Sequence, residues 1–227
     1  MQLDFLANTG GKSRSRTIPI HNLVIGGWTG RNPKSVAHHI EELKAIGVAP
    51  PAHTPCFYRC SASLLTTCAK FEVLGGDSSG EVEFVLLMLD DGLWVTVGSD
   101  HTDRKVESYS VAVSKQICHK AIAARLWRFA DVEDHWDRLI LRSRIDENDR
   151  SVLYQEGGVT TMLHPANLME AYRRAGGEIR VGTVLFGGTL PVRGNIRPAR
   201  RFICELDDPV LGQKIEHAYE TEYLPVV

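Results

Sequence analysis

The sequence predicts an α+β fold that is mainly β. Short apolar runs bounded by glycine, proline and aspartate recur along the chain, which is typical of strands. Helical periodicity is confined to a few segments, and helices do not alternate with strands as they do in parallel α/β proteins. The 227 residues are 43% hydrophobic and 24% charged, enough to form one substantial core. We therefore expect a single domain spanning residues 1–227.

The N-terminal segment predicts small strands. Apolar residues at 3–6, 17–20 and 23–25 alternate with turn residues, and the last run ends at Gly26-Gly27-Trp28. Another strand is expected to begin at Cys56-Phe57-Tyr58, after a proline-rich connection.

A helix is predicted between these strands, over about residues 33–47. Pro33 stands near its start, and Gly47 ends it. Apolar residues recur at helical spacing within Ser35–Ile46: Val36, Ile40 and Leu43. Because glycines flank this helix, we expect it to act as a movable lid over a substrate.

The centre of the chain predicts a β-hairpin over residues 81–99. Two apolar runs flank Asp90-Asp91-Gly92, and Asp-Gly suits the positive backbone angles of tight hairpin turns. Glu81-Val82-Glu83 opens the first run, and Asp100 follows the second.

The second half predicts helices followed by strands. Lys115–Arg128 has helical character, as does part of Asp131–Arg142. Pro165–Ala175 begins with proline and is followed by Gly176-Gly177, which are signals for a helix start and end. The remaining runs predict strands: 179–186, 201–205 and 214–227.

Composition excludes several classes of partner. With 26 basic and 28 acidic residues the formal net charge is −2, which gives no large field for binding nucleic acid or an anionic membrane. No apolar stretch approaches the roughly 20 residues of a membrane span, and Met1-Gln2-Leu3-Asp4 lacks the pattern of a secretory signal. We expect a cytoplasmic protein, with its five cysteines reduced.

Three carboxylates form a candidate site for a hard metal ion. Glu81 and Glu83 share one face of an extended strand because side chains alternate, and a hairpin could return Asp100 beside them. The charge of a carboxylate beside an apolar strand is stabilised by a divalent cation, by a lysine or arginine side chain, or by solvent. All three explanations stay open from the spacing alone.

These motifs, taken in order, resemble those of the fumarylacetoacetate hydrolase superfamily, and within it a small branch similar to DUF2848. The family's metal motif is matched by Glu81-Val82-Glu83-Phe84 and by Asp100-His101-Thr102-Asp103-Arg104. The resemblance implies that Glu81, Glu83 and Asp100 bind Mg²⁺ or Mn²⁺. It also implies a mixed β-sheet roll or barrel with a few short helices.

The resemblance also implies a catalytic lysine about twenty residues after the metal-binding aspartate. Lys120, in Cys118-His119-Lys120-Ala121, stands at this distance, and Lys115 is the alternative. The surroundings of Lys120 depart from the family's Lys-x-Phe-Asp pattern.

A histidine and a glutamate on the lid helix are implied as the group that activates water. His39 and Glu42 have the family's His-x-x-Glu spacing, and His38 with Glu41 fits it equally. A carboxylate one helical turn from an imidazole can orient it as a general base. Elsewhere, His101 and His119 are alternative acid or base groups.

Substrate contacts are implied for residues on several loops. Gln155 and Thr189, the latter in Gly187-Gly188-Thr189, are similar to the family's substrate-side glutamine and Gly-Thr loop. Arg31 and Arg104 are expected to hold a substrate carboxylate, for which Arg59 is an alternative.

The expected function is that of a metal-dependent hydrolase that cleaves a C–C bond of a small oxo acid and acts as a homodimer. A decarboxylase or isomerase of a 2-oxo acid could use the same metal site. A metal-free binding or scaffold protein is the third hypothesis, in which the carboxylates pair with Arg104 and Lys120. Only 17 positions separate Glu83 from Asp100, where the family has a longer insertion.

Overall fold

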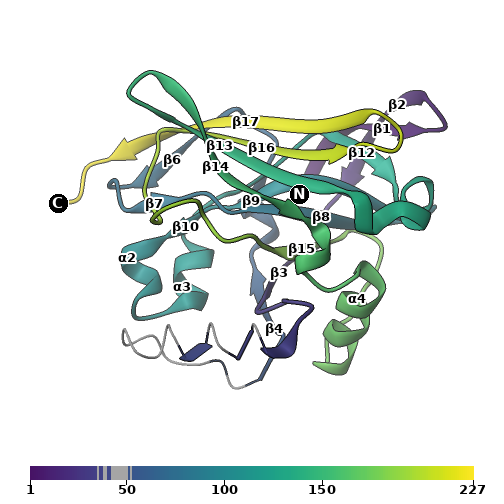
Figure 1. Cartoon of the computed structure of the whole chain (residues 1–227), viewed down its shortest axis with the longest axis horizontal. Helices are drawn as coiled ribbons and strands as arrows, with labels where there is room; N and C mark the ends of the chain where they lie inside the picture. The colour runs from purple at the N-terminus through teal and green to yellow at the C-terminus, as the bar shows by residue number, and fades with distance from the viewer. Residues whose placement is uncertain (35, 38–39, 42–50, 52) are drawn as a thin grey trace.

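The structure is a computed structural model that describes residues 1–34, 36–37, 40–41, 51 and 53–227. The predicted helix over about 33–47 lies largely outside these residues. Two sheets build most of the fold (Figure 1). The chain is therefore α+β and mainly β, as the sequence predicts.

The larger sheet has ten strands. They are β1 (Gln2–Thr9), β2 (Lys12–Pro19), β3 (Asn22–Gly27), β4 (Cys56–Cys60), β5 (Leu65–Thr66), β8 (Val82–Leu89), β9 (Gly92–Asp100), β11 (Lys120–Ile122), β12 (Arg125–Arg128) and β15 (Thr183–Thr189). Their order is β2-β1-β12-β9-β8-β15-β3-β4, with β11 paired to β9 and β5 paired to β11. The sheet is mixed, since β15 is parallel to β3 and antiparallel to β8.

The smaller sheet has five strands. They are β6 (Lys70–Leu74), β13 (Ile140–Glu147), β14 (Arg150–Gly158), β16 (Arg201–Asp208) and β17 (Gln213–Leu224), in the order β14-β13-β16-β17-β6. A short antiparallel pair, β7 (Ser78–Ser79) with β10 (Thr102–Asp103), stands apart from both sheets. Figure 1 shows β16 and β17 running across one side of the molecule.

The helices whose bounds the described residues define are few and short. They are α2 (Arg104–Glu107), α3 (Val111–Gln116), α4 (Pro165–Arg174) and the 3₁₀ turns η1 (Ala62–Leu64), η2 (Phe129–Asp131), η3 (Glu133–Arg138) and η4 (Val159–Thr161). In Figure 1, α2 and α3 lie at one end of the sheets and α4 at the other. Among the described residues no helix is long and apolar enough to cross a membrane.

The helix predicted over Lys115–Arg128 is wrong. Helix α3 ends at Gln116, and Lys120–Ile122 and Arg125–Arg128 form β11 and β12 against β9. Pairing with a buried strand outweighs the modest helical propensity of this segment. The partly helical reading of Asp131–Arg142 is correct only as 3₁₀ turns, because β13 begins at Ile140. The helix predicted over Pro165–Ala175 is confirmed.

Strand β8 is buried on both faces. Phe84 and Leu86 belong to the apolar cluster that also contains Phe202 of β16. Val85 and Leu87 belong to the second cluster, on the opposite face of the ten-stranded sheet. Alternation along the strand accounts for this division. The hairpin strand that carries the candidate acidic residues is therefore anchored in two cores.

The turn between β16 and β17 depends on a buried carboxylate. Asp208 accepts hydrogen bonds from the amides of Val210 and Leu211 at 2.9 and 3.1 Å, and lies 3.0 Å from Nε2 of His135 in η3. Burial would raise the pKa of Asp208, but the hydrogen bonds, led by that of His135, outweigh it and lower the pKa. This side chain links the 3₁₀ segment to the five-stranded sheet.

We expect Asp208→Ala to lower the free energy of unfolding by about 2 kcal/mol at pH 7, because it removes the acceptor of the Val210 and Leu211 amides and the charged partner of His135. Since the folded-state pKa is depressed, the contribution is present above the unfolded value of about 3.9 and is lost as the pH falls through the folded value. Urea unfolding at pH 7 and pH 3 measures the difference, which should shrink at pH 3. The exposed Asp134→Asn should change the stability little; an equal effect of Asp208→Ala at both pH values would contradict the assignment.

Candidate functional site

The strand register places three charged residues in one row. The β8–β9 hairpin pairs Glu83 with Gly98 and Val82 with Ser99, and Asp100 N donates to the carbonyl of Glu81 at 3.0 Å. Strand β11 continues the row by pairing Lys120 with Asp100. Because directly opposed residues share a face of a sheet, Glu81, Asp100 and Lys120 lie side by side.

Glu83 is held on the same face by the neighbouring strand β15. Its Oε2 accepts a hydrogen bond from Gly188 N at 2.7 Å, and the side chain is buried. Gly188 has φ +96°, and a Cβ there would lie 1.9 Å from Thr29 Oγ1. Only glycine fits this position, so the glycine pair before Thr189 lets the backbone approach Glu83.

The three predicted metal ligands are brought together. Each of Glu81, Glu83 and Asp100 offers an oxygen, and these atoms all lie within 4.8 Å of one another. Glu83 and Asp100 are buried, whereas Glu81 is partly exposed. We call these residues the carboxylate triad. The predicted proximity is confirmed, and the role of the triad as metal ligands stays a prediction.

Three cations surround the carboxylate triad. Lys120 Nζ lies 2.9 Å from Asp100 Oδ1, and Lys115 Nζ lies 2.5 Å from Asp100 Oδ2 and 3.6 Å from Glu81 Oε2. Arg104 Nη2 lies 3.1 Å from Glu81 Oε1. Both alternative lysines of the sequence therefore reach the same aspartate.

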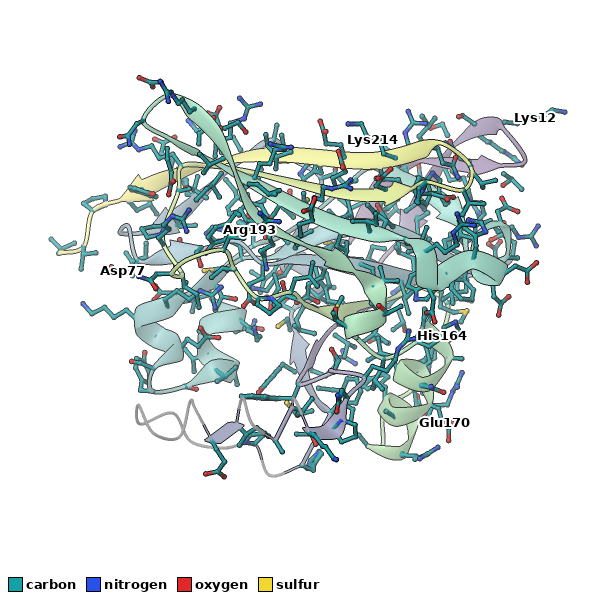
Figure 2. The ribbon with its side chains drawn as sticks, in the orientation of Figure 1. Lys12, Asp77, His164, Glu170, Arg193 and Lys214 are labelled. Carbon is teal, nitrogen blue, oxygen red and sulfur yellow. The ribbon has the colours of Figure 1, made fainter. Side chains whose placement is uncertain are left out.

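Arg104 is fixed from the opposite side. Its Nε donates to Ser79 Oγ at 2.7 Å and its Nη1 to Glu107 at 2.8 Å, and its backbone N–H donates to the carbonyl of Asp77. Asp77, the acceptor of that backbone hydrogen bond, is labelled at the left of Figure 2. The guanidinium is thus oriented toward Glu81.

Burial and nearby charges shift the pKa values of the two buried carboxylates, Glu83 and Asp100, in opposite directions. Burial raises the pKa of Glu83 well above its usual value, and the negative charges of Asp100 and Glu81 add to the rise. Burial also acts to raise the pKa of Asp100, but Lys115 and Lys120 outweigh it and lower the pKa to about 2. Asp100 is therefore the carboxylate that stays ionised, while Glu83 lacks sufficient positive charge nearby.

The donor set suits a hard divalent cation. Three carboxylates offer oxygen ligands, which Mg²⁺ and Mn²⁺ prefer. Asp100 Oδ1 is fully buried, with the ammonium of Lys120 2.9 Å away, whereas buried Glu83 is bound to the amide of Gly188. An additional cation would supply the positive charge that Glu83 lacks. The residues present fit a metal ion.

His101 belongs to a buried polar chain and does not face the carboxylate triad with its ring. Its Nδ1 lies 2.9 Å from Tyr219 Oη, its Nε2 lies 2.8 Å from Ser78 Oγ, and Tyr219 donates to Ser99 Oγ. Since the phenol donates to Ser99, Nδ1 carries the histidine proton and Nε2 accepts from Ser78. Burial, with the charge of Lys120, lowers the pKa of His101 to about 3, which makes it a poor base.

Gln155 and Thr189, both predicted to contact substrate, use their polar groups inside the protein. Gln155 Oε1 accepts from Val82 N and from Ser143 Oγ, and its Nε2 donates to Thr189 Oγ1 and to the carbonyl of Leu190. Thr189 Oγ1 donates to the carbonyl of Val82 at 2.8 Å. These contacts join the five-stranded sheet to the strand carrying the triad. Substrate contact by either residue stays a prediction.

The remaining predicted residues are placed as follows. The guanidinium of Arg31 is held by both carboxylate oxygens of Asp137 at 2.8 and 2.9 Å, and Arg59 donates to the side chain of Asn22. His119 Nδ1 lies 3.2 Å from the carbonyl of Leu64. The water-activating pair was predicted as His39 with Glu42, or His38 with Glu41. Positions 38, 39 and 42 lie outside the described residues, so this pair stays a prediction.

Sequence reasoning missed two features of the site. Lys115 bridges Glu81 and Asp100, although the sequence made it only the alternative to Lys120. Strand β4 pairs Cys56 with Gly27 and presents Cys56, Tyr58 and Cys60 on one face. Ser61, just after β4, donates its N–H to Gln116 of α3, so this strand borders the helix that carries Lys115. Alternation along 56–60 was the available signal.

The fold is that of the fumarylacetoacetate hydrolase superfamily. A yeast protein of this family, ynq8, aligns over 92% of this chain and 95% of its own, with a TM-score of 0.65 and 19% identity. A candidate fumarylpyruvate hydrolase from Burkholderia cenocepacia aligns over 99% and 96%, with a TM-score of 0.64 and 16% identity. The apo form of a 2-keto-3-deoxy-D-arabinonate dehydratase aligns over 92% and 77%, with a TM-score of 0.66 and 16% identity.

Residues 26–219 match the model of the family DUF2848, described as a protein of unknown function, and the chain belongs to this family. None of the curated proteins matches the sequence. The branch inferred from the ordered motifs is therefore confirmed by the family match, and the solved structures confirm the predicted fold.

We expect Gln155→Leu to lower the free energy of unfolding by about 2–3 kcal/mol, because it leaves Val82 N and the carbonyl of Leu190 buried without partners. Urea unfolding measures the loss. The same change at an exposed position, Gln2→Leu, should alter the stability by less than about 0.5 kcal/mol. Equal stability of the two variants would show that this amide does not join the sheets.

Proposed function

We propose that this protein is a divalent-metal-dependent enzyme that acts on a small oxo acid, with hydrolysis of a C–C bond as its reaction. The observation that carries the proposal is the convergence of Glu81, Glu83 and Asp100 within 4.8 Å at the ends of buried strands. An oxygen-only set of this kind, in which buried Glu83 is bound to a backbone amide and not to a cation of the described structure, supports Mg²⁺ or Mn²⁺ as the cofactor.

When bound, the ion would supply Lewis-acid polarisation of a chelating oxo acid, which favours enolate formation. The chain's own cations support the same chemistry. Lys120, fully buried, donates to the carbonyl of His101 at 2.6 Å and contacts Asp100, so its ammonium is fixed beside the triad. Arg104, held by Ser79 and Glu107, adds a second fixed positive charge that can attract the substrate carboxylate.

For hydrolysis, a base must take a proton from water. We assign this role to His39 with Glu42, as the resemblance implies, with His38 and Glu41 as the alternative register. The imidazole would accept the proton and the glutamate would orient the ring. His101 does not compete for this role, because its ring is buried between Tyr219 and Ser78.

A decarboxylase or isomerase reaction is the second candidate. One protein of similar structure is named as a dehydratase, and another, from Escherichia coli, as a candidate isomerase. The names of proteins with this fold are therefore not limited to hydrolases. These reactions would use the same triad and Lys120 and would not require the His39–Glu42 dyad.

A metal-free binding or scaffold protein is the candidate from another class. It is favoured by the ion pairs themselves, since Glu81 already contacts Arg104 and Asp100 already contacts Lys115 and Lys120. The unpaired position of Glu83 argues against it, because burial of an extra carboxylate without a cation is costly.

A homodimer in the cytoplasm remains part of the enzyme proposal, and ultracentrifugation tests the dimer.

We expect isothermal titration of the purified protein with Mn²⁺ or Mg²⁺ to give one ion per chain. Glu83→Ala should abolish this binding, because it removes a buried ligand of the triad. Glu72→Ala, which removes an exposed carboxylate of β6, is the matched control and should bind as the wild type does. Absence of binding at millimolar metal would favour the scaffold.

We expect oxalate, a mimic of an oxo-acid enolate, to bind the protein only in the presence of Mg²⁺. Arg104→Gln should weaken oxalate binding about tenfold and leave the stoichiometry of the metal unchanged, because its charge faces the triad. Lys105→Gln, on the exposed side of α2, controls for net charge. Equally tight oxalate binding without metal would contradict the proposed site.

We expect His39→Ala and Glu42→Ala to lower hydrolytic turnover of an oxo acid at least a hundredfold while metal binding persists, because general-base catalysis contributes about 10²–10⁴-fold. Decarboxylating turnover should be unaffected. Following both products for each variant separates the two reactions. If hydrolysis continued at the wild-type rate in both variants, the dyad assignment would be wrong.

A further inference from the structure

Lys115 occupies an unusual place for a lysine. It lies near the end of α3, whose N-cap Ser110 accepts from Val113 N, and its side chain is only 7% exposed. Lysine is seldom buried without a specific partner, and this ammonium points into the carboxylate triad. The proposed function does not use it.

The oxygens of two triad residues are divided among the three cations. Glu81 presents Oε1 to Arg104 and Oε2 to Lys115. Asp100 presents Oδ1 to Lys120 and Oδ2 to Lys115. Within the described residues, Lys115 is thus the cation that bridges two members of the triad, whereas Arg104 and Lys120 each reach one.

Arg104 and Lys120 are held by additional groups and Lys115 is held by the triad. Arg104 is bound by Ser79 and Glu107, and Lys120 by the carbonyl of His101. For Lys115 the hydrogen bond that the described structure contains goes to Asp100. If the carboxylates acquired another partner, Arg104 and Lys120 would keep their positions and Lys115 would lose its own.

We propose that the Lys115 ammonium occupies the cation position of the triad in the metal-free protein and that a divalent ion must displace it to bind. The inference rests on the proposed metal site. The ammonium contacts two of the three residues whose oxygens converge within 4.8 Å. Two cations that share these oxygens would repel strongly in a buried site, because Coulomb energies rise as the effective dielectric falls.

This arrangement gives Lys115 two functions. Its charge stabilises three clustered carboxylates in the absence of metal, and its displacement frees a positive charge for an anionic ligand. Metal binding and anion binding would therefore be coupled, since the lysine can neutralise the triad or the anion and cannot serve both at full strength.

The test is the Mn²⁺ affinity of Lys115→Met, measured by isothermal titration of the full chain. Methionine keeps the length and apolar stem of lysine and removes the charge. We expect Lys115→Met to bind Mn²⁺ at least tenfold more tightly than the wild type. Lys105→Met removes the same charge from an exposed position of the adjacent helix, and its affinity should stay within about twofold.

Each outcome decides between the alternatives. Equal or weaker Mn²⁺ binding by Lys115→Met, with normal binding by the wild type, would overturn the displacement and leave the proposed metal site intact. Binding by neither protein would overturn both. Binding by the variant alone would support the inference most directly, since it would show that the lysine excludes the ion.

A second measurement uses the wild-type protein and does not depend on the folding of the variant. Lysine acetylation by a small reagent is followed by mass spectrometry with and without Mn²⁺. We expect Lys115 to become at least several-fold more reactive when Mn²⁺ is bound, while Lys120, held by the carbonyl of His101, stays protected. Unchanged protection of Lys115 in a protein that binds Mn²⁺ would contradict the displacement.

Discussion

The hydrogen-bond register of the β8–β9 hairpin is the constraint on which the rest of the site depends. The turn pairs Leu89 with Gly92, and every later pair follows from it, so that Glu81 comes to lie opposite Asp100. A shift of one residue would turn the carboxylates to the opposite face, into the apolar cluster between the sheets. Burial of β8 on both faces makes such a shift costly, because it would exchange the side chains of two cores.

The site is a buried electrostatic cluster supported by apolar packing and by backbone. Three carboxylates and three cations would oppose each other almost evenly, yet the distribution is uneven, with Asp100 between two lysines and Glu83 bound to an amide. Taking charged groups out of water is unfavourable unless each is paired. Glu83, whose pKa is raised by burial, is therefore held by the fold and by a backbone amide, whereas the other two triad residues are held by cations in the described structure.

The sequence was sufficient for the fold class, the hairpin and the proximity of the carboxylates. The Asp90-Asp91-Gly92 turn and strict alternation fix both the register and the face of Glu81 and Glu83, so these predictions rest on local physical rules. The strands at 120–122 and 125–128 could not be predicted in this way, because pairing with β9 decides their conformation. Likewise, the contact of Lys115 with the triad depends on how α3 packs, and Gln155 satisfies partners on distant strands.

The tight turn between β8 and β9 has a consequence for how this branch can diversify. Because the link from Glu83 to Asp100 is only a hairpin, no inserted segment on that side can contribute to the shape of the binding site. Among the described residues, the segment bearing α2 and α3 is the neighbouring part of the chain that can change the shape of the site. Because Arg104 and Lys115 lie on that segment and contact the triad, a change there that reshapes the binding site also moves its positive charges, so ligand selectivity and site charge are coupled in this chain.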